Sequence, residues 1–209
     1  MKQDQTLELY GAPTGNCWRA AIALEEAGIP YRARVVDLYG GEHRETTFLE
    51  LNPAGKVPVL MDRSSVQPFV LSQSNAVVLY AAELAPGRLL SVTDRKARAH
   101  AYERYFYFLT DVIAVGHAAF SLRGPDDAAS RHILNSRMLA ALAFAERFAS
   151  ASRYIAGDTF TIADVAAVTI TASVAGQLDW DELPHLKRWF DEVMSRPSVS
   201  RGMSAFALR

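Results

Sequence analysis

The segment Asn52-Pro53-Ala54-Gly55-Lys56-Val57-Pro58-Val59-Leu60 decides how the first part of the chain folds. Pro58 stands directly before a short apolar run. Because a proline has no N–H to give to a sheet ladder, it is expected at the start or the edge of a strand. The bond before a proline is also the main place where a cis peptide is tolerated. A cis Val57–Pro58 bond would turn the Val57 N–H and C=O out of the sheet, where they can pair with an extended peptide.

The nearby segment Ser72-Gln73-Ser74-Asn75 is typical of the start of a helix. The unpaired N–H groups at such a start favour a carboxylate. One segment therefore offers strand-like pairing and the other offers an anion site, and together they predict a pocket for a small acidic peptide. The alternative is structural: Pro58 only starts a strand, and Ser72 only caps the helix.

The composition is that of an ordinary soluble protein: 209 residues, 50% hydrophobic, 22% charged, with a net charge of -1. The balanced charge gives no indication of nucleic-acid binding. No apolar run approaches the roughly 20 residues of a membrane span, and no signal-peptide core follows Met1, so we expect a cytoplasmic protein without a membrane partner. The single cysteine, Cys17, excludes an internal disulfide and a cysteine-based zinc cluster. The five histidines lack ligand spacing, and no metal is expected.

The pattern of strands and helices divides the chain into two domains, residues 1–84 and 92–209, joined by a linker at 85–91. In the first domain the order β-α-β-α-β-β-α predicts a small mixed sheet with helices on its faces. The second domain is predicted to be all helical. The expected strands are 6–10, 31–38, 57–61 and 68–71, and the expected helices are 18–27, 45–51, 73–84, 94–119, 127–151, 161–176 and a last one from 184 to before Pro197.

Thr161-Ile162-Ala163-Asp164 is predicted to be a capping box, with Asp in place of the usual Glu or Gln. Phe160 and Val165 then occupy the two positions of a hydrophobic staple. This motif is interpreted as structural.

These landmarks, in this order and spacing, resemble those of the cytosolic glutathione transferases over nearly the whole chain. The resemblance implies a thioredoxin-like α/β N-terminal domain and an all-α C-terminal domain. The loop Pro13-Thr14-Gly15-Asn16 is most similar to the bacterial Thr/Asn type of that family. The matching segments are 9–16, 24–31, 41–44, 48–53, 55–58 and 160–165.

The resemblance identifies the expected peptide as glutathione, a co-substrate with two carboxylates, an ammonium and a thiol. It implies that Val57, beside Pro58, pairs its backbone with the cysteinyl part, and that Gln73 and Ser74 hold the γ-glutamyl end. Family members usually carry an acidic residue at the position of Gln73, so the contact with the ligand ammonium is expected to be weaker here. The glycine carboxylate is assigned to His43 and Lys56, with Arg44 as a substitute.

The chemistry of such a protein needs a thiolate, whereas a free thiol with a pKa of about 8.5 is mostly protonated at neutral pH. We assign the hydroxyl of Thr14 and the amide of Asn16 as the catalytic donors to the sulfur. N-capping of the first helix is the alternative role for Asn16. Cys17 is the alternative centre, because a cysteine at a helix N-terminus can have a depressed pKa, or it is simply a small buried thiol. Tyr10 is assigned to the core.

The resemblance also implies an apolar electrophile site between the domains and a homodimer. Tyr105 and Phe108 are the candidates for the wall of this site, whereas Tyr102, Phe106 and Leu109 are assigned to the core.

Three functions remain open at this point. The first is a detoxifying transferase that conjugates the glutathione thiolate to small apolar electrophiles. The second is a glutathione-dependent disulfide or peroxide reductase on the same scaffold, and the third is a binding module without catalysis.

Overall fold

The computed structural model describes residues 6–207, which form two compact units. One unit holds the residues up to 89 together with those from 196 onward, and the other holds residues 90–195. The predicted second domain, 92–209, therefore differs from the observed unit at its C-terminal end.

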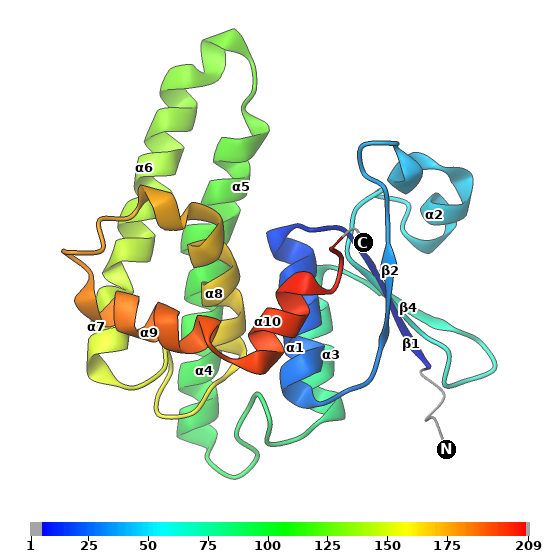
Figure 1. Ribbon diagram of the computed structural model, residues 1–209, viewed down its shortest axis with the longest axis horizontal. Helices are drawn as coiled ribbons and strands as arrows, with labels where there is room; N and C mark the ends of the chain where they lie inside the picture. The colour runs from blue at the N-terminus through cyan, green and yellow to red at the C-terminus, as the bar shows by residue number, and fades with distance from the viewer. Residues whose placement is uncertain (1–5, 208–209) are drawn as a thin grey trace. The chain divides into compact units, whose positions relative to one another are not determined.

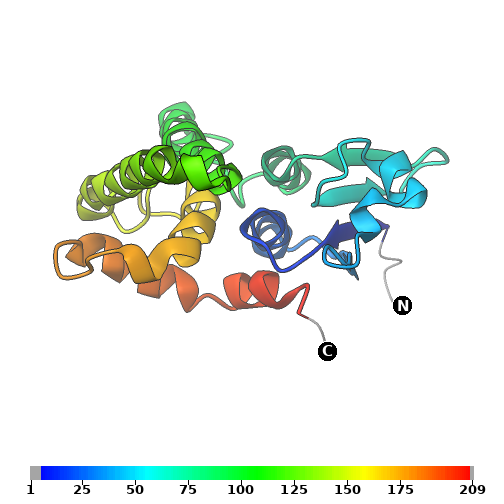
Figure 2. The same ribbon diagram turned by 90° about the horizontal axis from the view of Figure 1, so that it is seen from above.

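The first unit is built on a four-stranded mixed sheet in the order β2-β1-β3-β4. β1 and β2 are parallel, whereas β3 is antiparallel to both β1 and β4. Helices α1 and α3 lie on one face of the sheet and α2 lies on the other (Figure 1, Figure 2). This βαβαββα arrangement confirms the predicted thioredoxin-like fold. The elements are β1 (Leu7–Gly11), α1 (Gly15–Ala27), β2 (Arg32–Val35), the 3-10 helix η1 (Glu42–Arg44), α2 (Thr46–Leu51), β3 (Val59–Asp62), β4 (Phe69–Ser72) and α3 (Ser74–Leu84).

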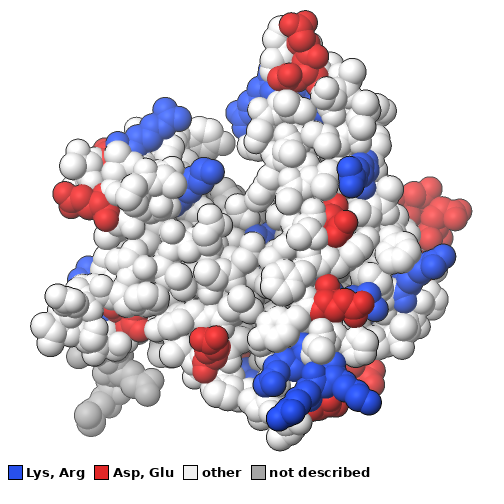
Figure 3. Space-filling model, turned by 180° about the vertical axis from the view of Figure 1, so that it is seen from behind, with Lys and Arg blue, Asp and Glu red and all other residues white. Residues whose placement is uncertain are grey.

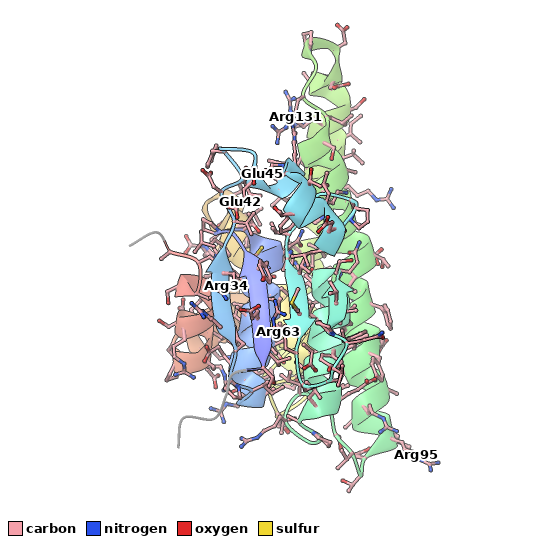
Figure 4. All side chains as sticks on the ribbon, turned by 90° about the vertical axis from the view of Figure 1, so that its right-hand side faces the viewer. Arg34, Glu42, Glu45, Arg63, Arg95 and Arg131 are labelled. Carbon is pink, nitrogen blue, oxygen red and sulfur yellow. The ribbon has the colours of Figure 1, made fainter. Side chains whose placement is uncertain are left out.

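The α2 face of the sheet has an apolar part and a charged part. Tyr10 packs against a buried cluster of Val36, Phe48 and Val59, so the helix α2 covers this part of the face. The buried carboxylate of Glu8 accepts hydrogen bonds from Arg34 on β2 and from Nε of Arg63, which follows β3, the latter at 3.0 Å. Figure 4 labels both arginines on this side of the sheet. Burial opposes ionisation of Glu8, but these two guanidinium groups hold its pKa below the usual value.

The C-terminal segment belongs to the first unit because helix α10 (Pro197–Ser204) packs on α1. Gly202 allows this close approach, since a Cβ atom there would lie 2.7 Å from the backbone nitrogen of Ile22. The carboxylate of Glu26 accepts from Nε of Arg196 at 2.6 Å and from Oγ of Ser198 at 2.5 Å. Both contacts join residues that are far apart in the sequence, and this explains why helical periodicity did not assign the segment to the first unit.

The second unit is helical, as predicted, but two of its long helices are interrupted. The side chain of Asp94 caps α4, accepting from the backbone nitrogens of Lys96 at 2.9 Å and Ala97 at 3.0 Å. A π-helical segment then separates α4 from α5, and α6 ends before Ala145. The elements are α4 (Arg95–Tyr107), the π-helix η2 (Phe108–Ile113), α5 (Ala114–Ser121), the 3-10 helix η3 (Pro125–Asp127), α6 (Ala128–Phe144), α7 (Glu146–Ala151), α8 (Ile162–Val174), the 3-10 helix η4 (Ala175–Gln177) and α9 (Pro184–Met194).

The core of the second unit is organised by α8, which is buried along most of its length. The predicted capping box is confirmed: Oγ1 of Thr161 accepts from the backbone nitrogen of Ala163 at 3.2 Å, and Oδ2 of Asp164 accepts from that of Thr161 at 2.8 Å. The carboxylate of Asp164 is fully buried and also accepts from Nε1 of Trp189 at 2.8 Å. The motif therefore joins α8 to α9.

The aromatic side chains of α4 face in directions other than those predicted. Tyr105 and Phe108, the candidates for a pocket wall, are fully buried, whereas Phe106, which was assigned to the core, is 53% exposed. Residues 105–109 are all apolar or aromatic, so their periodicity does not fix the phase of the helix. The π-helical turn that begins at Phe108 then shifts the phase further.

Across the described residues 6–207, no helix is long and apolar enough to cross a membrane. On the face shown in Figure 3, acidic and basic side chains are interspersed with uncharged areas. This distribution agrees with the net charge of -1.

Candidate functional site

The register of the sheet brings the predicted binding segments to one edge. Tyr10 on β1 pairs with Val59 on β3, and Val59 pairs in turn with Ser72 on β4. The end of β1, the start of β3 and the end of β4 are therefore neighbours. The loop that follows β1, the Val57–Pro58 turn and the start of α3 all leave the sheet at this edge.

The loop after β1 presents Thr14 and Asn16, and both side chains are partly accessible. Thr14 occupies the N-cap position of α1, but its side chain makes no capping hydrogen bond. Asn16 lies in the first turn of α1, and its Oδ1 accepts from Nη1 of Arg19 at 2.8 Å. The alternative in which Asn16 only caps the helix is therefore wrong.

Cys17 is a fully buried thiol, and its Sγ accepts from the backbone nitrogen of Ala12 at 3.4 Å. Burial raises the pKa of Cys17, while a hydrogen bond with Thr14 and the charge of Arg19 act in the opposite direction. A reactive cysteine needs access and a lowered pKa. Cys17 has neither, which favours the structural alternative.

The turn at Val57–Pro58 has the predicted cis peptide bond. β3 begins only at Val59, so Val57 lies outside the sheet ladder and is partly accessible. The buried Asn52 holds this turn, donating from Nδ2 to the carbonyl oxygen of Lys56 at 2.6 Å. The side chain of Lys56 is exposed.

His43 lies next to this turn because Gly55 has no side chain. Gly55 adopts a φ of +59°, and a Cβ atom there would come within 3.1 Å of the carbonyl oxygen of His43. Nδ1 of His43 is buried and has no hydrogen-bond partner among residues 6–207. A buried polar atom rarely lacks a hydrogen-bond partner, and a bound ligand is one way in which such an atom is satisfied. Arg44, the substitute for His43, is exposed.

The backbone of Gln73 is strained, with a φ of 81° and a ψ of 110°. Within residues 6–207, it is the one non-glycine residue with positive φ. Such conformations cost about 1–3 kcal/mol and cluster at ligand sites. Gln73, and not Ser72, occupies the N-cap position of α3, and its side chain makes no capping hydrogen bond. Ser74 follows as the first residue of α3 and is 5% exposed.

Sequence reasoning missed Arg19, which connects the two sides of this edge. Its side chain is 2% exposed, and its Nη1 donates both to Oδ1 of Asn16 at 2.8 Å and to Oγ of Ser74 at 3.1 Å. The signal was present, because Arg19 is the one charged residue in the otherwise apolar stretch 17–24. A charged residue in such a stretch is seldom buried unless it has partners.

The candidate site therefore lies within the first unit. Asn16 and Ser74 both accept hydrogen bonds from Arg19, and the backbone of His43 lies beside the turn that contains Lys56 and Val57. Tyr105 and Phe108 lie elsewhere, in the core of the second unit.

Comparisons with known proteins identify the family. The family model "Glutathione S-transferase, N-terminal domain" matches residues 15–84, and the model "Glutathione S-transferase, C-terminal domain" matches residues 102–197. The chain is 31% identical to glutathione S-transferase 1 of Dianthus caryophyllus, a match that covers 92% of this chain and 89% of that protein. The chain belongs to the glutathione S-transferase superfamily.

One further relative and one solved structure match nearly the whole chain. The disulfide-bond oxidoreductase YfcG of Escherichia coli is 28% identical, over 94% of each chain. The solved structure of a glutathione transferase family member from Pseudomonas fluorescens, with two glutathione molecules bound, aligns with a TM-score of 0.84 at 24% identity. That alignment covers 97% of this chain and 94% of the other, and it supports the fold.

Proposed function

We propose that this protein is a glutathione-dependent transferase that conjugates the thiolate of glutathione to small apolar electrophiles. The observation that carries the proposal is the edge of the sheet formed by the register of Tyr10, Val59 and Ser72. This edge presents an unladdered backbone, a helix start and two side chains able to donate to a sulfur. These are the groups that an extended peptide with a carboxylate and a thiol requires.

Each part of glutathione has a proposed partner. The backbone of Val57, held by the Pro58 turn, pairs with the cysteinyl part. Ser74 and the N–H groups at the start of α3 receive the γ-glutamyl carboxylate. The unpartnered Nδ1 of His43 and the exposed Lys56 serve the glycine carboxylate.

Gln73 completes the γ-glutamyl side of the proposed site. Its side chain accepts from the ligand ammonium without supplying a charge, and its strained backbone sets the direction in which α3 begins. At this position the chain has Gln73 in place of the acidic residue that the family resemblance implies.

The chemistry follows from donors directed at the sulfur. Thr14 and Asn16 stabilise the thiolate, so the thiol gives its proton to solvent near neutral pH. The sulfur then forms a bond to the electrophilic carbon, and the leaving group departs with the bonding electron pair. No side chain of the protein forms a covalent bond in this sequence.

Glutathione-dependent reduction of disulfides is the second candidate. The single cysteine of the chain is buried, so this reaction would use glutathione as the only thiol. The thiolate attacks one sulfur of the disulfide and expels the other as a thiolate. A second glutathione then attacks the mixed disulfide and yields glutathione disulfide. Similarity to the oxidoreductase YfcG supports this candidate.

The two candidates and the binding-module alternative are separated by measurements on the wild-type protein. We expect millimolar glutathione to raise the Tm, conjugation of an aryl halide to proceed, and reduction of a small disulfide or peroxide to be slower. The reverse order of rates would select the reductase. A raised Tm without any of these activities would select the binding module, and no change in Tm would refute the assignment of the site.

We further propose that the protein is a homodimer in the cytoplasm, where glutathione is the main thiol. Large apolar side chains remain exposed in each unit, among them Phe69 at 47% and Phe106 at 53%. Sedimentation equilibrium at micromolar concentration should give twice the 23.0 kDa of one chain. A mass of one chain at that concentration would contradict this proposal.

A further inference from the structure

Arg19 sets the hydrogen-bonding direction of two side chains in the proposed site. It lies on the second turn of α1, is 2% exposed, and its Nη1 reaches Asn16 on its own helix and Ser74 at the start of α3. A guanidinium group has donors and no acceptor. Whatever group it contacts must therefore turn an oxygen toward it.

For Asn16, this contact decides which way the amide points. Its Oδ1 faces Nη1 of Arg19 at 2.8 Å, so the NH2 group must point elsewhere. An amide that stabilises a thiolate has to present its NH2 group, because the oxygen would repel the anion. The guanidinium thus fixes Asn16 in the orientation that donation to a sulfur needs.

The same reasoning applies to Ser74. A serine hydroxyl has one proton to donate, and its oxygen can also accept. Because Oγ of Ser74 accepts from Arg19 at 3.1 Å, its own proton is directed away from the guanidinium. The hydroxyl can then donate to a carboxylate at the start of α3.

The charge of Arg19 favours anions at both places. Its field already acts on one sulfur in the first turn of α1, since it opposes the rise that burial causes in the pKa of Cys17. The group is also nearly inaccessible to water, and a buried charge interacts more strongly than an exposed one.

We propose that Arg19 is a positioning residue for glutathione, orienting Asn16 toward the sulfur and Ser74 toward the γ-glutamyl carboxylate. This inference rests on the proposed function. It predicts that one side chain, which makes no contact with the reacting atoms, controls both activation of the thiol and affinity for the peptide.

The test compares Arg19→Met, Arg19→Lys and Asn16→Ala with the wild type. The first readout is the pKa of the bound glutathione thiol, followed by the ultraviolet absorbance of the thiolate. We expect Arg19→Met to raise this pKa by about one unit and Arg19→Lys to restore part of the difference, because a lysine keeps the charge but loses the planar fork. The second readout is the affinity for S-methylglutathione, whose sulfur cannot ionise. We expect Arg19→Met to bind S-methylglutathione about tenfold more weakly than the wild type, because it loses one charge-assisted contact.

A double-mutant cycle decides whether Arg19 acts through Asn16. If Arg19 acts through Asn16, the substitution Arg19→Met changes the thiol pKa less in the Asn16→Ala background than in the wild-type background. Additive effects, or a thiol pKa unchanged in both Arg19 variants, would overturn the inference. Arg34→Met serves as the matched control, because Arg34 pairs with Glu8 on the α2 face of the sheet; this variant should leave both readouts unchanged.

Two safeguards keep the outcome interpretable. Circular dichroism and Tm show whether each variant is folded, and Arg19→Lys carries the test if Arg19→Met is not. If the wild type itself does not bind glutathione, the proposed function fails. If the wild type binds and the Arg19 variants behave like it, only the present inference fails.

Discussion

Replacing Asp164 with alanine should lower the free energy of unfolding of the helical unit by about 4 kcal/mol. The carboxylate is fully buried and accepts hydrogen bonds from the backbone nitrogens of Ile155 at 3.0 Å and Thr161 at 2.8 Å, and from Nε1 of Trp189 at 2.8 Å. Each buried donor left without a partner costs about 1–3 kcal/mol. Urea unfolding followed by tryptophan fluorescence and circular dichroism measures the change.

The matched control is Asp126→Asn, at an exposed aspartate. A substitution at such a surface position should stay within about 0.5 kcal/mol of the wild type. If Asp164→Ala lowers the free energy of unfolding by less than about 1 kcal/mol, the packing of α8 against α9 does not depend on this carboxylate.

The raised pKa of Asp164 should also make the stability of the protein depend on pH. Burial raises the pKa of Asp164 to about 6 and outweighs the hydrogen bonds that act in the opposite direction. The unfolded value is about 3.9, so the folded state binds the proton more tightly. The contribution of this group to stability is therefore present below about pH 4 and is lost as the pH rises to about 6. Glu26, whose pKa is lowered, contributes with the opposite sign.

Asp164→Asn isolates this effect, because asparagine does not titrate. The stability difference between the wild type and Asp164→Asn should shift against the wild type between about pH 4 and pH 6. A difference that stays constant over this range would contradict the raised pKa.

The second large effect is expected on kcat/KM, when a donor to the glutathione sulfur is removed. Removing the hydroxyl in Thr14→Val, or the amide in Asn16→Ala, should lower kcat/KM at neutral pH by about 10- to 100-fold, since each removes a donor that stabilises a developing anion. The reactive species is the thiolate, so a higher thiol pKa means that activity is lost at a higher pH as the solution is acidified. The pH profile of kcat/KM should therefore move to higher pH in both variants.

Cys17→Ala is the control for this second prediction. It removes the alternative centre, and because the thiol is buried, we expect nearly wild-type activity in the folded variant. Retained activity in Thr14→Val and Asn16→Ala, together with loss in Cys17→Ala, would transfer the chemistry to the cysteine.

Local patterns were enough to predict much of this protein. Strand alternation and turn residues gave the βαβαββα order, and the capping box at Thr161 was readable from four residues, since its two partners lie on one helical turn. The cis bond at Val57–Pro58 is likewise a local feature, because the bond before a proline is the main place where a cis peptide is tolerated.

Predictions that depended on the phase of a helix or on distant partners were less successful. Tyr105 was predicted to line a pocket and Phe106 to lie in the core, but Tyr105 is fully buried and Phe106 is 53% exposed. An aromatic run has no polar residue to mark the outer face of its helix. No helix was predicted after Pro197, and residues 197–209 were placed in the second domain by default. The helix α10 instead packs on α1, and its contacts with Glu26 and Ile22 could not be predicted because these residues lie more than a hundred positions earlier.

Local sequence was enough to give the order of elements in the first unit, the family resemblance and the segments that form the proposed site. Those properties arise from neighbours along the chain, where spacing is fixed by covalent geometry. Three features depend on the tertiary structure: Arg19 is buried in contact with both Asn16 and Ser74, Cys17 is inaccessible, and α10 packs on α1. These three features depend on contacts between side chains that are far apart in the sequence. Such contacts are set by the packing of helices and strands, which local sequence patterns do not give.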